Sequence, residues 1–224
     1  MDQPRRLLLA STSRYRKELL GRLGLAFETA APGVDEAPLA GEAPAATALR
    51  LAIAKAKALK SKFNDCLIIG SDQVASCGGV RYGKPGDHAS AVKQLRSLSG
   101  KAADFHTGLA LFDAASGRID SRVVLCRVVF RPLSDAVIEA YLRREQPYDT
   151  AASAKAESLG IALIARMETD DPSSLIGLPL IALTEMLERA GLPVLPRSST
   201  RYLPRSGGPP RTRLRRRRCR RSRR

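Results

Sequence analysis

The first half of the chain alternates apolar runs with stretches in which apolar residues recur at helical spacing. The run at residues 5–10 predicts a strand, and the uninterrupted apolar residues 66–69 predict a buried one. Shorter strands are expected at residues 25–32 and 80–85. Helical spacing and capping residues predict helices at residues 14–23, 44–62, 87–98 and 135–143, and a last helix that stops at Gly191. This alternation predicts an α/β fold.

The second half of the chain contains a hairpin pattern. Residues 104–133 comprise two strand-like segments joined by a turn at residues 115–117. Residues 160–168 are compatible with either a strand or a helix. Since a hairpin adds antiparallel strands to a sheet built from strand–helix alternation, the sheet is expected to be mixed.

Positive charge is concentrated at the C-terminal end. The formal net charge is +16, but the segment from Pro193 onward carries 13 Arg, no Lys and no acid, which leaves 25 basic and 22 acidic residues before it. The chain therefore divides into a nearly neutral body, residues 1–192, and an Arg-rich tail, residues 193–224. The tail has too few apolar residues to offset the cost of ordering, so we expect it to be disordered.

The Arg-rich tail has two interpretations. It is either an arm that binds nucleic acid or a membrane surface, or an extension without an adapted role. We favour the second, because nothing in the body cooperates with the tail. Nucleic acid is therefore expected as a partner only through the tail, if at all.

The cysteine and histidine content argues against a zinc site. The four cysteines form no C-x-x-C pair, and the chain has only two histidines. Cys66 and Cys126 lie in apolar runs and are predicted to be core residues. Because no signal-peptide core and no membrane-length apolar run is recognised, we expect a cytoplasmic protein without a membrane partner.

The stretch LLLASTSRYRKELL places hydroxyl groups and cations where a predicted strand meets a helix. Backbone N–H groups at a helix start carry partial positive charge, and Ser11 and Ser13 add hydroxyl donors. Arg16 and Lys17 in the first turn oppose the helix dipole, a conflict that a bound polyanion removes. The stretch is typical of a phosphate site, although an ordinary Ser-capped basic helix explains these residues equally well.

Four further charged residues have a chemical interpretation. Asp72 follows the buried strand, at a sheet edge where sites collect. Lys55 lies on the apolar stripe of its helix, so its ammonium group must either reach water or point into a cleft. Lys84 follows a short strand, and Glu36 lies in a loop. Taken alone, each of these four residues is explained as a turn or surface residue. Together with the hydroxyl groups and cations above, they supply the groups that phosphoanhydride cleavage needs. No P-loop motif is present.

Eight motifs follow one another in the order LLLASTSRYRKELL, VDE, AIAKAKAL, IIGSDQV, GKP, FHTGLAL, SAKAESLG and LIGLPL. In these motifs the chain resembles the Maf family of nucleotide pyrophosphatases over residues 7–192, and it is most similar to the subgroup that hydrolyses 7-methyl-GTP. The resemblance implies a Maf/ITPase-like α/β fold: an elongated mixed β-sheet with flanking helices and two lobes around a cleft. It also implies hydrolysis of a nucleoside triphosphate to a monophosphate and diphosphate, often by a homodimer.

The resemblance assigns roles to individual residues. Asp72 would be the catalytic proton acceptor, and Glu36 would join Asp72 in holding a divalent metal cation. The phosphate-binding residues would be Ser11, Ser13, Arg16, Lys55, Lys84 and Lys155. Base selection would fall to Tyr15, Gln73 and Glu157.

Physical chemistry is consistent with these roles. A carboxylate with an ordinary aspartate pKa of ~3.9 is a feeble base toward water, so Mg²⁺ or Mn²⁺ is expected to acidify the attacking water. Methylation at N7 makes guanine cationic, and an aromatic ring such as Tyr15 attracts a stacked cation by about 0.5–2 kcal/mol. The carboxylate of Glu157 can accept hydrogen bonds from the guanine N1–H and amino groups.

The chain departs from the family pattern at two positions. Arg14 stands where Pro is usual, which either loosens the helix start or adds a contact to phosphate. Lys17 stands where Arg is usual, which weakens a bidentate phosphate contact. Two alternatives to 7-methyl-GTP hydrolysis stay open: the same reaction on another standard or modified nucleotide, and a nucleic-acid-binding protein that acts through its tail.

Overall fold

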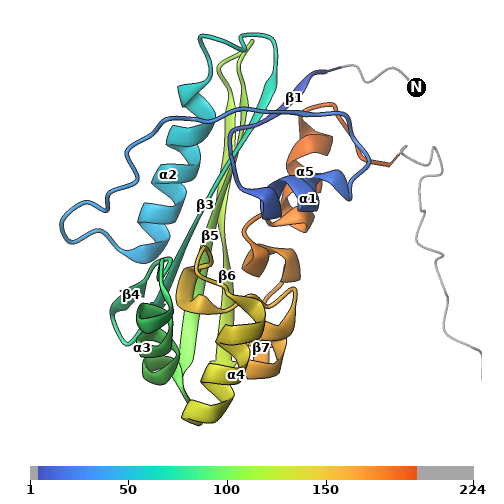
Figure 1. Ribbon diagram of the computed structural model, residues 1–224. Helices are drawn as coiled ribbons and strands as arrows, with labels where there is room; N and C mark the ends of the chain where they lie inside the picture. The colour runs from blue at the N-terminus through green and yellow to red at the C-terminus, as the bar shows by residue number, and fades with distance from the viewer. Residues whose placement is uncertain (1–4, 196–224) are drawn as a thin grey trace, which may run out of the picture.

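The computed structural model describes residues 5–195, and these form a seven-stranded mixed sheet flanked by helices on both faces (Figure 1). The strand order is β2-β1-β3-β5-β6-β7, and β4 pairs with β3. The strands are β1 (Leu7–Leu9), β2 (Glu28–Thr29), β3 (Leu67–Cys77), β4 (Val80–Tyr82), β5 (Ala102–Asp113), β6 (Ile119–Phe130) and β7 (Ile164–Glu168). Strand β1 is parallel to β2 and β3, whereas the other pairings are antiparallel, so the predicted mixed sheet is confirmed.

The long strands β3, β5 and β6 run through both lobes of the molecule (Figure 1). The α-helices are α1 (Arg14–Gly21), α2 (Pro44–Ala58), α3 (His88–Leu98), α4 (Asp135–Glu145) and α5 (Leu180–Arg189). Three short 3₁₀ helices are η1 (Ala151–Ser153), η2 (Leu159–Leu163) and η3 (Pro172–Ile176). At one end of the sheet, α1 and α5 bury apolar side chains against one face and α2 covers the other; at the far end, α3 and α4 pack on β5 and β6.

Two glycines let α2 approach the sheet unusually closely. A Cβ atom added to Gly70 on β3 would lie 2.1 Å from the carbonyl oxygen of Ala52, and one added to Gly108 on β5 would lie 2.1 Å from that of Ala48. Both distances are far below van der Waals contact, so a larger residue would push the helix away. The small-residue face of α2 thus lies directly on the strand that carries Asp72.

The predicted hairpin and most helix starts are confirmed, whereas several element ends differ. Strands β5 and β6 pair across the turn as expected, and Asp87 and Ser134 cap α3 and α4. Helix α2 ends at Ala58 instead of residue 62, because the chain there tightens into turns with i→i−3 bonds from Lys60 and Lys62. The strand expected at residues 25–32 is only the two residues of β2, which pair with β1 alone.

Residues 160–168, which the sequence left open, divide between the two structures. Helix η2 covers their first part and β7 their second. Cys66 and Cys126 are buried in the core, as predicted. Residues 196–224 of the Arg-rich tail lie outside the described residues, and so does the expectation that the tail is disordered.

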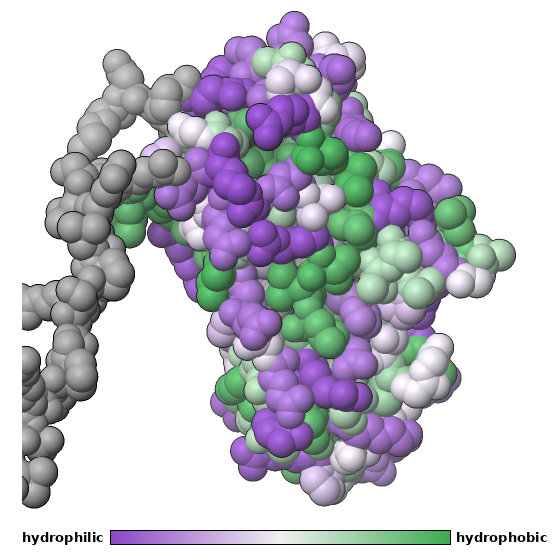
Figure 2. Space-filling view, turned by 180° about the vertical axis from the view of Figure 1, so that it is seen from behind, coloured by the Kyte–Doolittle hydropathy of each residue, from purple (hydrophilic) through white to green (hydrophobic). Residues whose placement is uncertain are grey.

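The surface of the described chain has mixed polarity. Figure 2 shows hydrophobic residues among hydrophilic ones across the middle of the face turned away in Figure 1. Exposed apolar side chains include Leu125 on β6 and Ile181 on α5. Within residues 5–195, no helix is both long and apolar enough to cross a membrane.

Candidate active site

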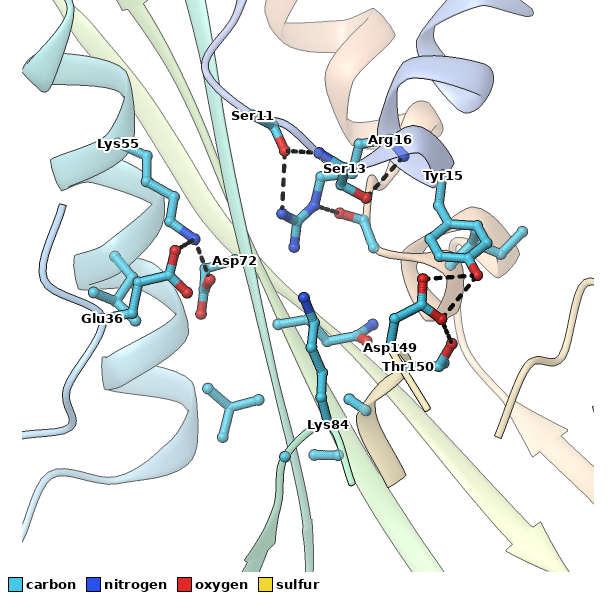
Figure 3. Close-up of a pocket in the computed structure, with 18 of the residues that line it drawn as sticks. Ser11, Ser13, Tyr15, Arg16, Glu36, Lys55, Asp72, Lys84, Asp149 and Thr150 are labelled. Atoms are coloured by element: carbon cyan, nitrogen blue, oxygen red, sulfur yellow. Dashed lines mark hydrogen bonds and ion pairs between the residues drawn. The ribbon is translucent and has the colours of Figure 1, made fainter. Parts of the chain in front are cut away.

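A cavity of about 730 Å³ opens between the two lobes beside β3 (Figure 3). Its wall comes from the start of α1, from α2 and the loop before it, from β3 and from the turn after β4. Residues 149–151 close another side. Segments that are distant in sequence therefore line the same cavity.

Hydroxyl groups and a guanidinium group form one corner of the cavity, at the start of α1. Ser13 caps α1 as predicted: its Oγ accepts a hydrogen bond from the backbone N–H of Arg16 at 3.4 Å. The Oγ of Ser11 accepts one from the backbone N–H of Ser13 at 3.1 Å and lies 3.5 Å from Nη1 of Arg16. Nε of Arg16 donates to the carbonyl oxygen of Gly177 at 2.8 Å, which fixes the guanidinium group.

A lysine bridges two carboxylates on the opposite wall (Figure 3). Nζ of Lys55 lies 2.7 Å from Oδ1 of Asp72 and 2.7 Å from Oε1 of Glu36. Lys55 and Asp72 are only 4% and 7% exposed, whereas Glu36 reaches in from an exposed loop. Burial lowers the pKa of the Arg16 guanidinium, and the negative charges of Asp72 and Glu36 oppose that shift.

The carboxylates of Asp72 and Glu36 suit a divalent cation. Both reach the same ammonium nitrogen, so they converge on one point where positive charge is stabilised. A pair of carboxylates completed by water and phosphate oxygens is a common donor set for Mg²⁺. Within residues 5–195, no group of three or more His, Cys, Asp or Glu side chains could hold a metal ion. The residues therefore fit a cation that is bound jointly with phosphate groups.

Lys84 extends from the turn after β4 toward the middle of the cavity (Figure 3). This turn is bonded at two points to the segment 148–152, which runs into η1. The backbone N–H of Gly86 donates to the carbonyl oxygen of Tyr148 at 3.0 Å, and that of Ala152 donates to Gly83 at 3.2 Å. The position of Lys84 thus depends on the same segment that closes the cavity.

An aromatic ring and two carboxylates lie at the other end of the cavity. The hydroxyl group of Tyr15 donates to Asp149, with distances of 3.2 and 3.4 Å to the two carboxylate oxygens. Glu157 also lines the cavity. Partial desolvation of the carboxyl group raises the pKa of Glu157, although the residue as a whole is exposed to solvent. The positive charge of Lys155 opposes that shift.

Comparison with known proteins decides the family. The family model described as Maf-like protein matches residues 6–190. The chain belongs to the Maf family.

Three relatives with the name 7-methyl-GTP pyrophosphatase are similar over most of their length. The protein from Thiobacillus denitrificans is 58% identical over 189 residues, which are 84% of this chain and 94% of that protein. The one from Bordetella avium is 57% identical over 192 residues, 86% of this chain and 96% of that protein. The one from Cupriavidus pinatubonensis is 55% identical over 188 residues, 84% of this chain and 94% of that protein.

Most residues assigned from the Maf resemblance line the cavity. They are Ser11, Ser13, Tyr15, Arg16, Glu36, Lys55, Asp72, Gln73, Lys84 and Glu157. Lys155 lies outside this wall: its Nζ is 2.6 Å from Oε1 of Glu145 and 5.8 Å from the centre of the Tyr15 ring. A phosphate contact by Lys155 would need this ion pair to open, and it stays a prediction.

Gln73, assigned to base selection from the Maf motif, also links β3 to the 3₁₀ helix η3. Its amide nitrogen donates within the 3₁₀ helix η3, to the carbonyl oxygens of Ser174 at 2.9 Å and Leu175 at 3.0 Å, and lies 3.0 Å from Oγ1 of Thr107. The carbonyl Oε1 is then the atom that an N–H group of a base would meet. A role of Gln73 in base selection stays a prediction.

Arg81, Asp149 and Thr150 are among the cavity-wall residues that sequence reasoning missed. Arg81 donates to the backbone oxygen of Glu42 and to Oγ1 of Thr47, the latter at 3.1 Å. Its place in VRYGKP, three residues before Lys84, was a signal that could have been used. Asp149 and Thr150 carry no comparable signal, because only the folded chain brings them to the end of the cavity where Tyr15 lies.

Proposed function

We propose that this chain hydrolyses 7-methyl-GTP to 7-methyl-GMP and diphosphate. Relatives that are 55–58% identical to it over most of the chain carry that activity in their names. The observation that carries the proposal is the common cavity of a nearly buried carboxylate, Asp72, and three cations, Arg16, Lys55 and Lys84. Cations neutralise the triphosphate, and a carboxylate beside them can accept a proton from water.

The residues divide the reaction between them. Ser11, Ser13 and Arg16 bind phosphate oxygens at the start of α1, where backbone N–H groups add partial positive charge. Asp72 takes a proton from water as its oxygen attacks the α-phosphorus. The bond from that phosphorus to the bridging oxygen breaks, and diphosphate leaves with the electron pair, stabilised by Lys55 and Lys84.

Asp72 and Glu36 would hold Mg²⁺ or Mn²⁺ together with the phosphates. A divalent cation supplies acidification of water and charge screening when bound. Before the nucleotide arrives, Lys55 keeps the two carboxylates close to each other.

Tyr15 and Glu157 account for the choice of base. The ring of Tyr15 offers a face on which a cationic purine gains energy by stacking. Glu157 offers a carboxylate for the N1–H and amino groups of guanine. Ionised Glu157 also favours a base that carries positive charge.

Two further expectations and one alternative accompany this proposal. A homodimer, expected from the family, and a cytoplasmic location both stay predictions, as does nucleic-acid binding through the tail. Light scattering with the full chain and with a chain ended after residue 192 tests the first. Salt dependence of RNA binding by the same two chains tests the last.

A panel of nucleotides tests the proposed function. Diphosphate release is measured for 7-methyl-GTP, GTP, ATP, CTP, UTP and dTTP, with Mg²⁺ and Mn²⁺ supplied separately. The proposal expects the highest kcat/KM for 7-methyl-GTP with one of these metals. A higher value for another nucleotide would assign the same chemistry to a different substrate, and no release from any of them would remove the enzymatic proposal.

A further inference from the structure

Two protein cations already lie against the ring of Tyr15. The guanidinium carbon of Arg14 is 4.7 Å from the ring centre, and Nζ of Lys155 is 5.8 Å from it. Both contacts have the geometry of a cation–π interaction. A cationic base that stacks on this ring therefore approaches two like charges.

Each of these cations is paired with a carboxylate. Lys155 pairs with the largely buried Glu145 at 2.6 Å. Arg14 lies 3.5 Å from the carboxylate of Asp149, and its Nη2 also donates to the hydroxyl oxygen of Tyr15 at 2.7 Å. Asp149 is thus in contact with both the ring and the cation that lies over it.

The backbone around Asp149 is strained. Gln146, Ala152 and Ser153 have φ values of 48°, 58° and 56°, and within residues 5–195 they are the non-glycine residues with positive φ. Such conformations each cost on the order of 1 kcal/mol and persist only where the surroundings enforce them. Here the backbone bonds to the turn that carries Lys84 hold the segment, so that Asp149 contacts the Tyr15 hydroxyl at one end of the cavity.

We propose, on the basis of the function proposed above, that Asp149 is a specificity-determining residue for the cationic base. Its charge neutralises Arg14, so that the Tyr15 ring can accept a second cation. Its hydrogen bond with the Tyr15 hydroxyl holds the ring in the cavity wall. Loss of the charge alone should therefore weaken the binding of the methylated base more than that of neutral guanine.

A double-mutant cycle tests the charge. Asp149→Asn keeps an acceptor for the Tyr15 hydroxyl and removes the negative charge. The ratio of kcat/KM for 7-methyl-GTP to that for GTP should fall about three- to fivefold in Asp149→Asn, as expected for an exposed charge contact. In an Arg14→Ala background, the same substitution should change the ratio less than twofold, since no cation is left to neutralise.

A matched control separates this effect from a general loss of charge. Asp120 forms an exposed ion pair with Arg189 at 2.7 Å and lies outside the cavity wall. Asp120→Asn should leave the substrate ratio unchanged. Calorimetric binding of 7-methyl-GMP and GMP, which needs no turnover, should show the same three- to fivefold loss of preference in Asp149→Asn.

The outcomes distinguish this inference from the proposed function. If the wild-type protein prefers the methylated nucleotide and Asp149→Asn keeps that preference in full, the inference is wrong and the proposed function stands. An equal loss of preference in the wild-type and Arg14→Ala backgrounds also overturns it. A wild-type protein without any preference for the methylated base overturns both.

Discussion

Nζ of Lys55 lies 2.7 Å from Oδ1 of Asp72, and both side chains are almost fully buried. The contact exists because Gly70 and Gly108 allow α2 to lie directly on the strands beside it. A nearly buried carboxylate that loses its directly bonded cation is disfavoured, since the remaining surroundings compensate its charge less well. The pair is therefore expected to matter for both stability and catalysis.

Substitution of Lys55 tests this pair. Lys55→Met keeps the length of the side chain and leaves Asp72 without its ammonium partner. We expect kcat/KM to fall about 100-fold or more, and the free energy of unfolding to fall by about 3 kcal/mol. Lys57→Met, on the exposed side of the same helix, is the control, and both quantities should stay near the wild-type values. Equal effects of the two substitutions would exclude a specific role for the buried pair.

Gly177 holds Arg16 in place, because its carbonyl oxygen accepts the hydrogen bond from Nε of Arg16. Its φ is 112°, and an added Cβ would lie 3.4 Å from Nε of Arg16. Gly177→Ala should destabilise the fold by about 1–3 kcal/mol through backbone strain. It should also raise KM for the nucleotide, because a shift of the strained backbone moves the carbonyl oxygen that holds Arg16. Gly191 has a φ of 80° with no atom near its Cβ position. Gly191→Ala should therefore lose stability while KM is unchanged, and a raised KM in both variants would refute the argument.

Asp171 caps the N-terminus of α5, although it precedes that helix by several residues in the sequence. The helix begins after Pro179, which has no side-chain cap, and the buried Asp171 accepts hydrogen bonds from the backbone N–H groups of Ile181 at 2.8 Å and Ala182 at 3.1 Å. Asp171→Ala should lower the free energy of unfolding by about 2–4 kcal/mol, measured by urea denaturation. Asp170→Ala, its exposed neighbour, should change it by less than about 0.5 kcal/mol. If both variants lost a similar free energy of unfolding, the loss in Asp171→Ala could not be assigned to the cap.

The raised pKa of Glu157 predicts how base preference depends on pH. Because the group must be ionised to bind the cationic base, the preference for 7-methyl-GTP over GTP should fall as the pH is lowered, and the fall should begin above the pH range in which an ordinary glutamate titrates. The linked stability has the opposite sign: it is present below the unfolded pKa and lost as pH rises through the folded one. It should be small, because the side chain is exposed.

Glu157→Gln isolates this titration. The variant should show a low preference for the methylated base that no longer varies over this pH range. The ratio of kcat/KM for the two nucleotides, measured at each pH in both proteins, provides the test. A ratio in Glu157→Gln that follows the wild-type curve would assign the pH dependence to another group.

Local patterns predicted the positions that depend on local structure. Ser13 was predicted to be a helix cap because the apolar run ends just before it, and the structure shows the cap. Lys55 was predicted to reach water or a cleft because it lies on an apolar helical stripe, and it points inward. Asp72 was expected to follow a buried strand at a sheet edge, and this expectation is wrong: β3 continues from Leu67 to Cys77, so Asp72 lies inside a central strand, paired with Gly108 of β5. It nevertheless lines the cavity, because its side chain points to the face where the two lobes meet.

The remaining features depend on contacts between distant segments. The bond of Lys155 to Glu145 and the contact of Tyr15 with Asp149 require the relative positions of α1, α4 and the segment before η1. No periodicity encodes those positions. The two-residue β2 likewise reflects pairing with a single neighbour, which hydrophobic pattern alone does not predict.

The central claim is that Asp72 accepts the proton of the attacking water, and Asp72→Asn tests it most directly. The substitution keeps the shape of the side chain and removes the base. Diphosphate release from 7-methyl-GTP should fall by at least about 100-fold, while the circular dichroism spectrum of the folded protein is retained. Release within about threefold of the wild-type rate would contradict the claim, because catalysis would then not depend on this carboxylate.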